Sequence, residues 1–277
     1  MIFDIEHASF VDGPGIRTTV FFKGCNLRCS WCHNPESQSF SPQVLVFPEK
    51  CFGCGKCELV CRNNLKRCDG CGVCEIHCPA GARKLRGQEK SVEEIVEEVL
   101  SDLPFYENCG GGVTFSGGEC MLQPELLMQL LEKMKEAGVH TAVDTAGAVS
   151  WDRFEKILPL TDLFLYDLKC MDPEVHRLHT GVDNQLILQN LRKLLERGVK
   201  VWIRIPVIPG VNDSEENMRS VREFLDAWGW PEKIELLAYH AMGENKYRAL
   251  GKEPVIYPVP IPEHMAKLNE IFTRKGN

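Results

Sequence analysis

The sequence predicts an α/β protein built around a mainly parallel β-sheet. Short apolar runs rich in β-branched residues alternate along most of the chain with longer segments whose apolar residues recur at helical spacing. Parallel strands must be joined by long crossovers, usually helices, so repeated strand–helix order favours a parallel sheet. The 277 residues, 44% apolar and 26% charged, suffice for one substantial core, or for one core and a small accessory unit.

The first half of the chain supplies three expected strands and two expected helices. The run 18–22 is apolar and β-branched, and residues 113–116 and 141–144 are similar short runs, so all three are expected to be strands. Residues 91–103 have the apolar spacing of an amphipathic helix, and residues 124–137 form a second expected helix that starts on a proline and is followed by a glycine.

The second half continues the same order. The expected strands are residues 163–167, 200–205 and 234–238, and the expected helices are 151–158, 185–197 and a helix that Asn212-Asp213-Ser214 caps and that runs to about Ala227. Catalytic groups in such folds sit at the carboxyl ends of parallel strands. The polar residues found at those ends are Glu119, Asp144, Asp167 and His240.

Composition narrows the function classes. A net charge of −7 argues against nucleic acid, whose binders carry clustered Lys and Arg. No apolar run of about 18 residues could span a membrane, and Asp4 and Glu6 stand where a signal peptide would have basic residues, so we expect a cytoplasmic protein. Without a secretory signal, fourteen cysteines indicate metal or redox chemistry more than disulfides.

The first cysteine group is Cys25, Cys29 and Cys32, on a short loop directly after the first expected strand. Three thiolates on one loop can hold three irons of a [4Fe–4S] cube and leave the fourth iron open to a cofactor, much as catalytic zinc sites keep an open position. The loop therefore predicts a reactive cluster. The remaining cysteines Cys109, Cys120 and Cys170 have no ligand spacing and are expected to be small buried hydrophobes.

Two further cysteine runs have the spacing of bacterial two-cluster ferredoxins, in which the fourth cysteine of each run ligates the other cube. This predicts one cube on Cys51, Cys54, Cys57 and Cys78, and another on Cys61, Cys68, Cys71 and Cys74. Arg62 replaces the usual proline, and only six residues separate the runs, so the pairing stays open. A zinc-ribbon interpretation of the same cysteine pairs is the alternative.

The cysteine loop, with Trp31 as its aromatic residue, resembles the signature of radical S-adenosylmethionine enzymes. The segment from Asp12 to Arg17 and the Cys32-His33-Asn34 sequence are similar to those of the glycyl-radical-enzyme activating enzymes, the pyruvate formate-lyase activating enzyme family. The similarity extends from Phe10 to about Leu250. The ferredoxin-like segment is absent from the shortest members of that family and resembles the insert of its longer members.

The resemblance implies a partial (β/α)6 barrel formed by residues 1–47 and 86–277, with an inserted ferredoxin-like domain at residues 48–85 that binds two [4Fe–4S] clusters. It implies S-adenosylmethionine and three [4Fe–4S] clusters as cofactors, and the redox chemistry of an oxidoreductase. Cys25, Cys29, Cys32 and Lys169 are the expected catalytic residues. The expected cofactor-binding residues are Trp31, Gly117, Gly118, Glu119, Asp144, Thr145, Asp167, Lys169 and His240.

Each cofactor contact has a chemical reason. Gly117 and Gly118 would let the backbone come close to a ligand, and the Glu119 carboxylate would pair with the amino group of S-adenosylmethionine. By resemblance, His240 would lie against the adenine. Ala146 stands where relatives often have a polar side chain, so no contact is expected from it.

The same resemblance assigns Asp12 and Arg204 to the glycine loop of a partner glycyl radical enzyme, the expected protein substrate. A ferredoxin or flavodoxin is the expected electron donor. Two alternatives are a radical enzyme that acts on a small molecule or another peptide, and a plain electron-transfer module. The second leaves the first cysteine loop unexplained. The sequence does not identify the partner, the donor or the oligomeric state.

Overall fold

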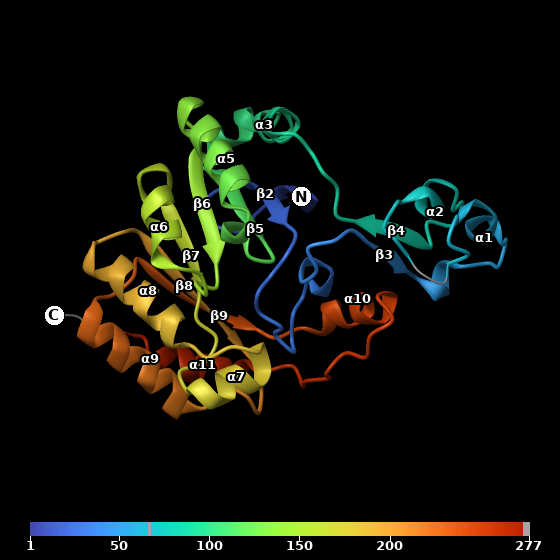
Figure 1. The fold of residues 1–277 in the computed structure, drawn as a ribbon. Coiled ribbons are helices and arrows are strands. Elements are labelled where there is room, and N and C mark those ends of the chain that lie inside the picture. Colours follow the sequence, from blue (N-terminus) through green and yellow to red (C-terminus); the bar gives the residue numbers. More distant parts are fainter. Residues whose placement is uncertain (66–67, 274–277) are drawn as a thin grey trace.

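The computed structural model describes residues 1–65 and 68–273 and contains a seven-stranded sheet (Figure 1). The strand order is β1-β2-β5-β6-β7-β8-β9, and only the edge pair β1–β2 is antiparallel. The strands are β1 (Ile2–Ser9), β2 (Arg17–Phe22), β5 (Gly112–Gly117), β6 (His140–Thr145), β7 (Leu163–Asp167), β8 (Val201–Val207) and β9 (Lys233–Ala238). Six parallel strands in an open order confirm the expected partial (β/α)6 arrangement.

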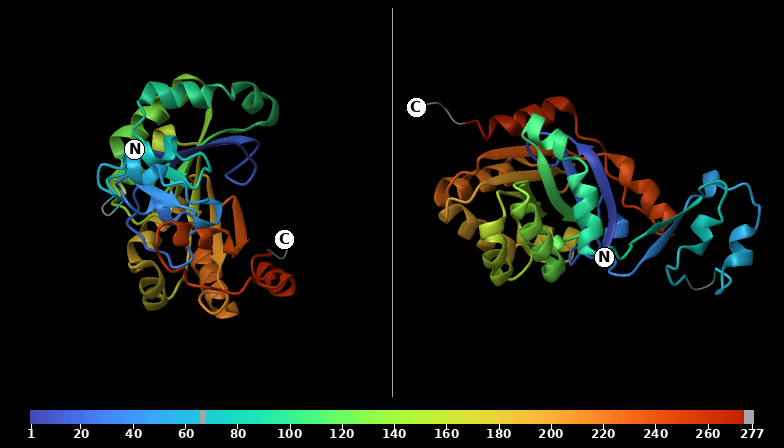
Figure 2. Two further views of the ribbon diagram at one scale, coloured as in Figure 1. Left: turned by 90° about the vertical axis from the view of Figure 1, so that its right-hand side faces the viewer. Right: turned by 90° about the horizontal axis from the view of Figure 1, so that it is seen from above.

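Helices connect successive parallel strands and flank the sheet (Figures 1 and 2). They are α3 (Val92–Leu100), α4 (Leu103–Cys109), α5 (Pro124–Glu136), α6 (Trp151–Ile157), α7 (Pro173–Thr180), α8 (Gln185–Glu196), α9 (Glu215–Trp228), α10 (Glu244–Ala249) and α11 (Pro262–Glu270). Short 3-10 turns are η1 (Pro35–Ser37), η2 (Pro48–Lys50), η3 (Cys120–Leu122), η4 (Leu158–Leu160) and η5 (Ala241–Gly243). None of the helices within the described residues is long and apolar enough to cross a lipid bilayer.

Most expected elements are confirmed to within two residues, and one helix is shorter than expected. Ser91 and Glu94 form a reciprocal capping box that starts α3, but α3 ends at Leu100, where the sequence predicted a helix to residue 103. A turn at Ser101 and Asp102 separates it from α4. The sequence had predicted neither β1 nor the helices α7, α10 and α11.

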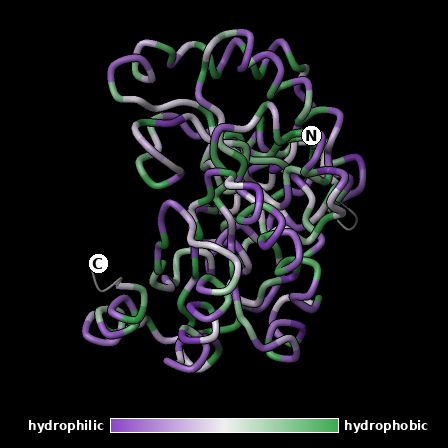
Figure 3. The backbone as a smooth tube through the Cα atoms, turned by 90° about the vertical axis from the view of Figure 1, so that its left-hand side faces the viewer, coloured by the Kyte–Doolittle hydropathy of each residue, from purple (hydrophilic) through white to green (hydrophobic). Residues whose placement is uncertain are grey.

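Apolar side chains from the strands and from the inner faces of the helices form the main core. The expected stripe on α5 is confirmed, since Leu127, Leu130, Leu131 and Met134 are fully buried. Green, hydrophobic backbone gathers at the centre of Figure 3, while purple segments lie mainly on its outer helices. Cys120 and Cys170 are buried as expected, whereas Cys109 is exposed at the end of α4, so that expectation was wrong.

The cysteine-rich segment extends away from the sheet (Figures 1 and 2). Its base is a separate antiparallel ribbon of β3 (Gln43–Val46) and β4 (Arg83–Arg86), in which Gln43 pairs with Arg86 and Val46 with Arg83. Between these strands lie the short helices α1 (Lys56–Val60) and α2 (Val73–Ile76), which contact each other. The insert boundaries at residues 48 and 85 stay a prediction.

Candidate active site

The first cysteine loop is fastened to the end of β2 and to the segment after β5. The backbone N–H of Gly118 donates to Phe22 O at 2.8 Å, and that of Glu119 donates to Gly24 O at 2.9 Å. Continuation of the parallel β2–β5 pairing beyond the sheet thus carries Glu119 to the start of the loop that holds Cys25. Strand pairing alone therefore brings together two motifs that lie about ninety residues apart.

The rest of the loop is held by α7 and α10. Arg28 N–H donates to Thr180 O at 2.7 Å, Ser30 N–H donates to His179 O at 2.9 Å, and the Tyr247 hydroxyl donates to Cys29 O at 3.2 Å. Burial, followed by the nearby Glu119 carboxylate, raises the pKa of the Cys25 thiol to about 12. Burial, and after it the neighbouring Cys29, raises the pKa of the Cys32 thiol to about 12. The loop therefore gathers its three thiols in one partly buried place.

Gly117 and Gly118 each also meet a steric requirement within the fold. A Cβ on Gly117, which has φ +119°, would lie 2.2 Å from the Phe22 backbone N and O. A Cβ on Gly118 would lie 2.3 Å from Gly24 O and 2.9 Å from Ser37 O. The close approach is to the backbone of the chain itself, and these glycines let the cysteine loop seat against β5.

Glu119 links the ends of β5 and β6 and is 1% exposed. The Thr145 hydroxyl lies 2.9 Å from each carboxylate oxygen, and the Ala146 N–H donates to Oε2 at 3.1 Å. Burial raises the pKa of Glu119 to about 7, although the hydrogen bonds from Thr145, Met121 and Ala146 oppose that shift. Glu119 can therefore exchange a proton near neutral pH, and a cation placed beside it would favour the ionised form.

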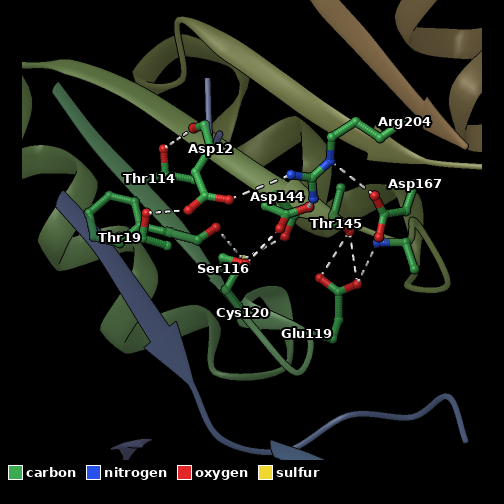
Figure 4. A network of polar contacts seen from close by, with 12 residues as sticks. Asp12, Thr19, Thr114, Ser116, Glu119, Cys120, Asp144, Thr145, Asp167 and Arg204 are labelled. Carbon is green, nitrogen blue, oxygen red and sulfur yellow. Dashed lines mark hydrogen bonds and ion pairs between the residues drawn. The ribbon is translucent and has the colours of Figure 1, made fainter. Parts of the chain in front are cut away.

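Arg204, from β8, forms ion pairs with three carboxylates that belong to separate parts of the chain (Figure 4). Its guanidinium contacts Asp144 closely, lies 3.2 Å from Asp167 Oδ1 and lies 3.7 Å from Asp12 Oδ1. Burial alone would lower the pKa of Arg204, but the three carboxylates outweigh burial and raise it. The arginine is therefore a fixed cation at the centre of the site.

Lys169 joins this network to the cysteine loop. Its Nζ lies 3.1 Å from Asp167 Oδ2, and its side chain is 9% exposed. Burial would lower the pKa of Lys169, but Asp167 and then Cys29 raise it above its ordinary value. The pKa of Asp167 is lowered in spite of burial, because Lys169 and Arg204 both face it, whereas burial raises the pKa of Asp144.

Asp12 reaches this network from the turn between β1 and β2. Its Oδ2 accepts hydrogen bonds from Ser9 at 2.7 Å and Thr19 at 2.8 Å, and its backbone O accepts one from Thr114 at 2.6 Å (Figure 4). The fully buried Arg17 donates from Nε to the same Thr114 hydroxyl at 2.6 Å. The turn is thus built to point the Asp12 carboxylate towards Arg204.

His240 and Trp31 lie together beside the cysteine loop. A small pocket there is lined by Trp31, Cys32, Tyr239 and His240, together with residues of the C-terminal segment. The ring of His240 meets that of His33 edge to face, with centroids 4.6 Å apart. Trp31 contacts His179, which the sequence analysis left unassigned, and Tyr257. The predicted adenine residue therefore borders the loop and lies beside an aromatic cluster.

Four of the insert cysteines line a common pocket, whereas the predicted partition into two cubes stays a prediction. Cys51, Cys54, Cys57 and Cys78 line one pocket together, so the fourth cysteine of the second run joins the first run. Backbone N–H groups point at sulfur in both runs: Leu65 donates to Cys61 at 3.2 Å, and Ala82 donates to Cys78 at 3.3 Å. Within residues 1–65 and 68–273, no three His, Cys, Asp or Glu side chains converge as ligands of a single metal ion.

Comparison with known proteins identifies the family to which the chain belongs. A model described as the Radical SAM superfamily matches residues 19–221. A choline trimethylamine-lyase activating enzyme from Oleidesulfovibrio alaskensis is 43% identical over 277 aligned residues, covering 94% of this chain and 88% of that protein. The chain belongs to the radical SAM activating enzymes. This family installs glycyl radicals in partner enzymes by means of S-adenosylmethionine and a [4Fe–4S] cluster.

Other relatives agree with this membership. A pyruvate formate-lyase-activating enzyme from Clostridium pasteurianum is 39% identical and covers 90% of this activating enzyme and 86% of its own length. A solved domain of a pyruvate-formate lyase-activating enzyme from Bacteroides vulgatus has 36% identity and a TM-score of 0.51, covering 58% of this chain and 92% of that chain. The structure of Streptococcus suis SuiB shares the fold, with 12% identity and a TM-score of 0.58. The alignment covers 91% of this chain and 44% of the SuiB chain.

Three residues of this activating enzyme were missed by sequence reasoning. Lys246 Nζ, on α10, lies 3.0 Å from Oε1 of the 1%-exposed Glu36 and donates to Asn34 Oδ1 at 2.6 Å. Buried Lys23 donates to Glu36 O at 2.5 Å. Both lysines thus hold Glu36 in the chain that follows Cys32. None of these three residues belongs to a periodic pattern or a ligand-spacing motif, so only the folded structure reveals their contacts.

Proposed function

We propose that this protein activates one glycyl radical enzyme by abstracting a Cα hydrogen from its glycine loop, with Cys25, Cys29 and Cys32 as the cluster ligands. A reduced cluster held by these three thiolates would supply the one electron for cleavage of the sulfonium–C5′ bond of S-adenosylmethionine, giving methionine and, after hydrogen abstraction from the glycine, 5′-deoxyadenosine. The observation that carries the proposal is the acid–base network of Asp12, Asp144, Asp167, Lys169 and Arg204 beside the cysteine loop.

The charge of this network fits a cationic cofactor. Three carboxylates, those of Asp12, Asp144 and Asp167, face two cations, Lys169 and Arg204, and Glu119 adds a carboxyl group that can ionise near neutral pH, so carboxylates outnumber the buried cations. S-adenosylmethionine carries a sulfonium and an ammonium against one carboxylate. A buried excess of negative charge is costly unless a ligand compensates it, so the network favours binding of that cofactor.

Within this proposal, each side chain has a defined task. Lys169, between Asp167 and Cys29, binds the cofactor carboxylate close to the cluster loop. The ends of β5 and β6, with Glu119, Thr145 and Asp144, bind the ammonium and the ribose. Their existing hydrogen bonds hold these acceptors in place before the cofactor arrives. Trp31 and His240 border the adenine.

Asp12 and Arg204 are proposed to bind the backbone of the partner's glycine loop. Both groups sit next to Asp144 and Asp167, and the Nη1–Oδ1 distance of 3.7 Å between them is longer than a direct hydrogen bond. Peptide N–H and C=O groups could pair with this carboxylate and guanidinium without breaking the tighter contacts of Arg204 to Asp144 and Asp167. The glycine Cα would then lie next to the cofactor site.

The insert is proposed to hold two more [4Fe–4S] clusters, giving three in all. The shared pocket of Cys51, Cys54, Cys57 and Cys78 supports the crossed ligand assignment, with Cys61, Cys68, Cys71 and Cys74 holding the other cube. N–H groups directed at Cys61 and Cys78 fit thiolate ligands, because such hydrogen bonds tune cluster potential. A ferredoxin or flavodoxin is the proposed donor. A cytoplasmic location stays a prediction.

The partner is proposed to be a lyase, dehydratase or related glycyl radical enzyme, since relatives include activating enzymes of choline trimethylamine-lyase and trans-4-hydroxy-L-proline dehydratase. The test is anaerobic incubation of reconstituted protein with dithionite and S-adenosylmethionine, followed by quantification of 5′-deoxyadenosine and methionine. Candidate partners are then added, and the glycyl radical is measured by EPR. Absence of cofactor cleavage by cluster-loaded protein would exclude the proposal.

A further inference from the structure

Glu36 is a buried carboxylate in η1, four residues after Cys32 of the first cysteine loop. Its Oε1 lies 3.0 Å from Nζ of Lys246, whereas its Oε2 is buried and has no hydrogen-bond partner within residues 1–65 and 68–273. The buried Lys23 donates to the backbone O of the same residue. Because a buried carboxylate is costly without a compensating charge, the ion pair with Lys246 ties α10 to the chain that follows Cys32.

The helix that carries Lys246 lies directly against the cysteine loop. α10 has six residues, too few for a helix to be stable through its own hydrogen bonds. The Tyr247 hydroxyl donates to Cys29 O at 3.2 Å, and a Cβ on Gly243, just before the helix, would lie 2.9 Å from Cys32 O. α10 also contacts η1 and β3, where the cysteine-rich insert joins the barrel (Figure 1). The position of α10 therefore depends on tertiary contacts.

The segment around Lys246 forms one wall of the small pocket beside Trp31. Four of the lining residues lie within six positions of Lys246, namely His240, Gly243, Glu244 and Tyr247. Lys246 itself pairs with Glu36, outside the residues that line the pocket. The wall is thus carried by a short segment whose ionic anchor lies outside the pocket.

Anchoring of this kind affects binding more than chemistry. If α10 were held less firmly, residues 239–247 would have to become ordered when a ligand binds, and that loss of conformational freedom would weaken the affinity. An interaction that is equally strong before and during the bond-breaking step changes the affinity and leaves the rate of the bound complex unchanged. The anchor should therefore influence how tightly a ligand is held in this pocket.

We propose that Lys246 and Glu36 are positioning residues for S-adenosylmethionine: their ion pair holds α10 on the cysteine loop, so that His240 and Tyr247 stand in place before the cofactor binds. This inference rests on the proposed function and adds to it two residues that do not themselves contact the cofactor. A plain structural ion pair would lower stability when broken and would leave the cofactor affinity of the folded protein unchanged. The two roles therefore differ in a measurable quantity.

The test compares three single variants. Lys246→Met removes the charge and keeps a long, flexible side chain, and Lys246→Arg keeps the charge as a conservative rescue. Arg248→Met is the matched control, because it removes a cation of the same helix whose partner, Glu244, belongs to α10 itself. Iron content and the EPR spectrum of each dithionite-reduced protein establish that its clusters are intact.

Three quantities are measured on cluster-loaded protein. They are the Kd of S-adenosylmethionine by calorimetry, the single-turnover rate of 5′-deoxyadenosine formation at saturating cofactor, and amide hydrogen exchange of residues 239–250 without cofactor. We expect Lys246→Met to raise the Kd about tenfold and to accelerate exchange in this segment, while the saturated rate stays within about twofold of wild type. Lys246→Arg should restore most of the affinity, and Arg248→Met should bind as the wild type does.

Glu36→Gln examines the same pair from the other side. Combined with Lys246→Met, it should weaken cofactor binding no more than either single change does, because the two side chains act as one unit. Unchanged affinity and exchange in Lys246→Met, an equal loss in Arg248→Met, or additive losses in the double variant would each overturn the inference. Failure of the proposed function would look different, because dithionite-reduced wild-type protein would then not cleave S-adenosylmethionine at all.

Discussion

The Nε atom of Arg204 lies 3.2 Å from Oδ1 of Asp167, whose other oxygen lies 3.1 Å from Lys169 Nζ. One carboxylate is therefore shared by the arginine that the sequence assigned to the partner and the lysine that it assigned to the cofactor. Arg204 also pairs with Asp144, another predicted cofactor residue. The cofactor site and the proposed glycine-loop site are one electrostatic unit, and changes at Arg204 must affect both.

Arg204→Ala is expected to destabilise the fold strongly. It would leave Asp12, Asp144 and Asp167 facing one another with Lys169 as their remaining cation in the network. Breaking a buried ion pair from one side costs about 3–5 kcal/mol. Urea unfolding of the apoprotein measures this, with Arg219→Ala as the control, because that exposed helical pair with Glu215 is worth about 0.3–0.5 kcal/mol. Equal losses in the two variants would refute the buried network.

Asp12→Asn is the better variant for separating partner binding from cofactor cleavage. Asp12 is the most distant of the three carboxylates from Arg204, and an amide can still accept hydrogen bonds from Ser9 and Thr19. We expect dithionite-driven 5′-deoxyadenosine formation to stay within about threefold of wild type, while the EPR-detected glycyl radical yield falls by tenfold or more. A parallel loss of both activities would contradict the role proposed for Asp12.

Glu119 should give the folded protein a distinct pH dependence. The pKa of Glu119 is raised from 4.5 to about 7, so between these values the folded protein keeps a proton that the unfolded chain has released. The free energy of unfolding should therefore decrease as pH rises from about 4.5 to about 7, by a total on the order of 3 kcal/mol. In Glu119→Gln this contribution is absent. Urea unfolding across that range checks it, and parallel profiles would contradict the assignment.

Cofactor binding should show the opposite trend if Glu119 pairs with the ammonium group. Ionised Glu119 attracts the ammonium, so the affinity for S-adenosylmethionine should rise with pH through about 7, whereas Glu119→Gln should bind more weakly with a flatter pH profile. Equilibrium binding to cluster-loaded protein measures this. An equally steep rise in the Gln variant would place the titrating group elsewhere.

The anaerobically reconstituted wild type is expected to bind about twelve irons, four for each of three cysteine sets. Replacing Cys25, Cys29 and Cys32 together by Ala should leave about eight, because the insert pocket of Cys51, Cys54, Cys57 and Cys78 does not include the first loop. Iron and acid-labile sulfide analyses provide the measurement. A wild-type insert loaded with zinc would favour the zinc-ribbon alternative.

Replacing Cys54 and Cys71 by Ala should separate the two routes of reduction. Activation driven by a protein donor should fall sharply, whereas dithionite or photoreduced deazaflavin, which can reach the first cluster directly, should restore much of the 5′-deoxyadenosine yield. The comparison needs matched folding, because metal ligation also holds this short segment together. If chemical reductants restore nothing while the first cluster is intact, the insert acts by shaping the active site.

Sequence reasoning succeeded where structure follows from local periodicity or ligand spacing. The bounds of β7 were predicted to the residue, and Ser214 caps α9 as expected. Each of these two signals is contained within a few consecutive residues. The partition of the insert cysteines rests on spacing alone and stays a prediction, although Cys78 and Cys51 line the same pocket.

Contacts that depend on packing between distant segments could not be predicted from the sequence. Asp12 and Arg204 are separated by almost two hundred residues, and nothing in either local motif indicates that they meet beside Asp144. The structural need for Gly117 was also hidden, because the tight approach of Phe22 exists only once β2 and β5 are paired. The same holds for the buried Glu36, whose partner Lys246 comes from the other end of the chain.

The β3–β4 ribbon gives the cysteine-rich segment the character of an interchangeable module. Val46 and Arg83 are direct partners across two antiparallel strands, so the chain leaves and re-enters the ribbon at points only about 5 Å apart. A two-residue hairpin can close that gap as readily as a long insertion. Gain, loss or exchange of everything between these residues would therefore leave the strand register of the seven-stranded sheet unchanged, so this position of the fold can accept segments of different length and sequence.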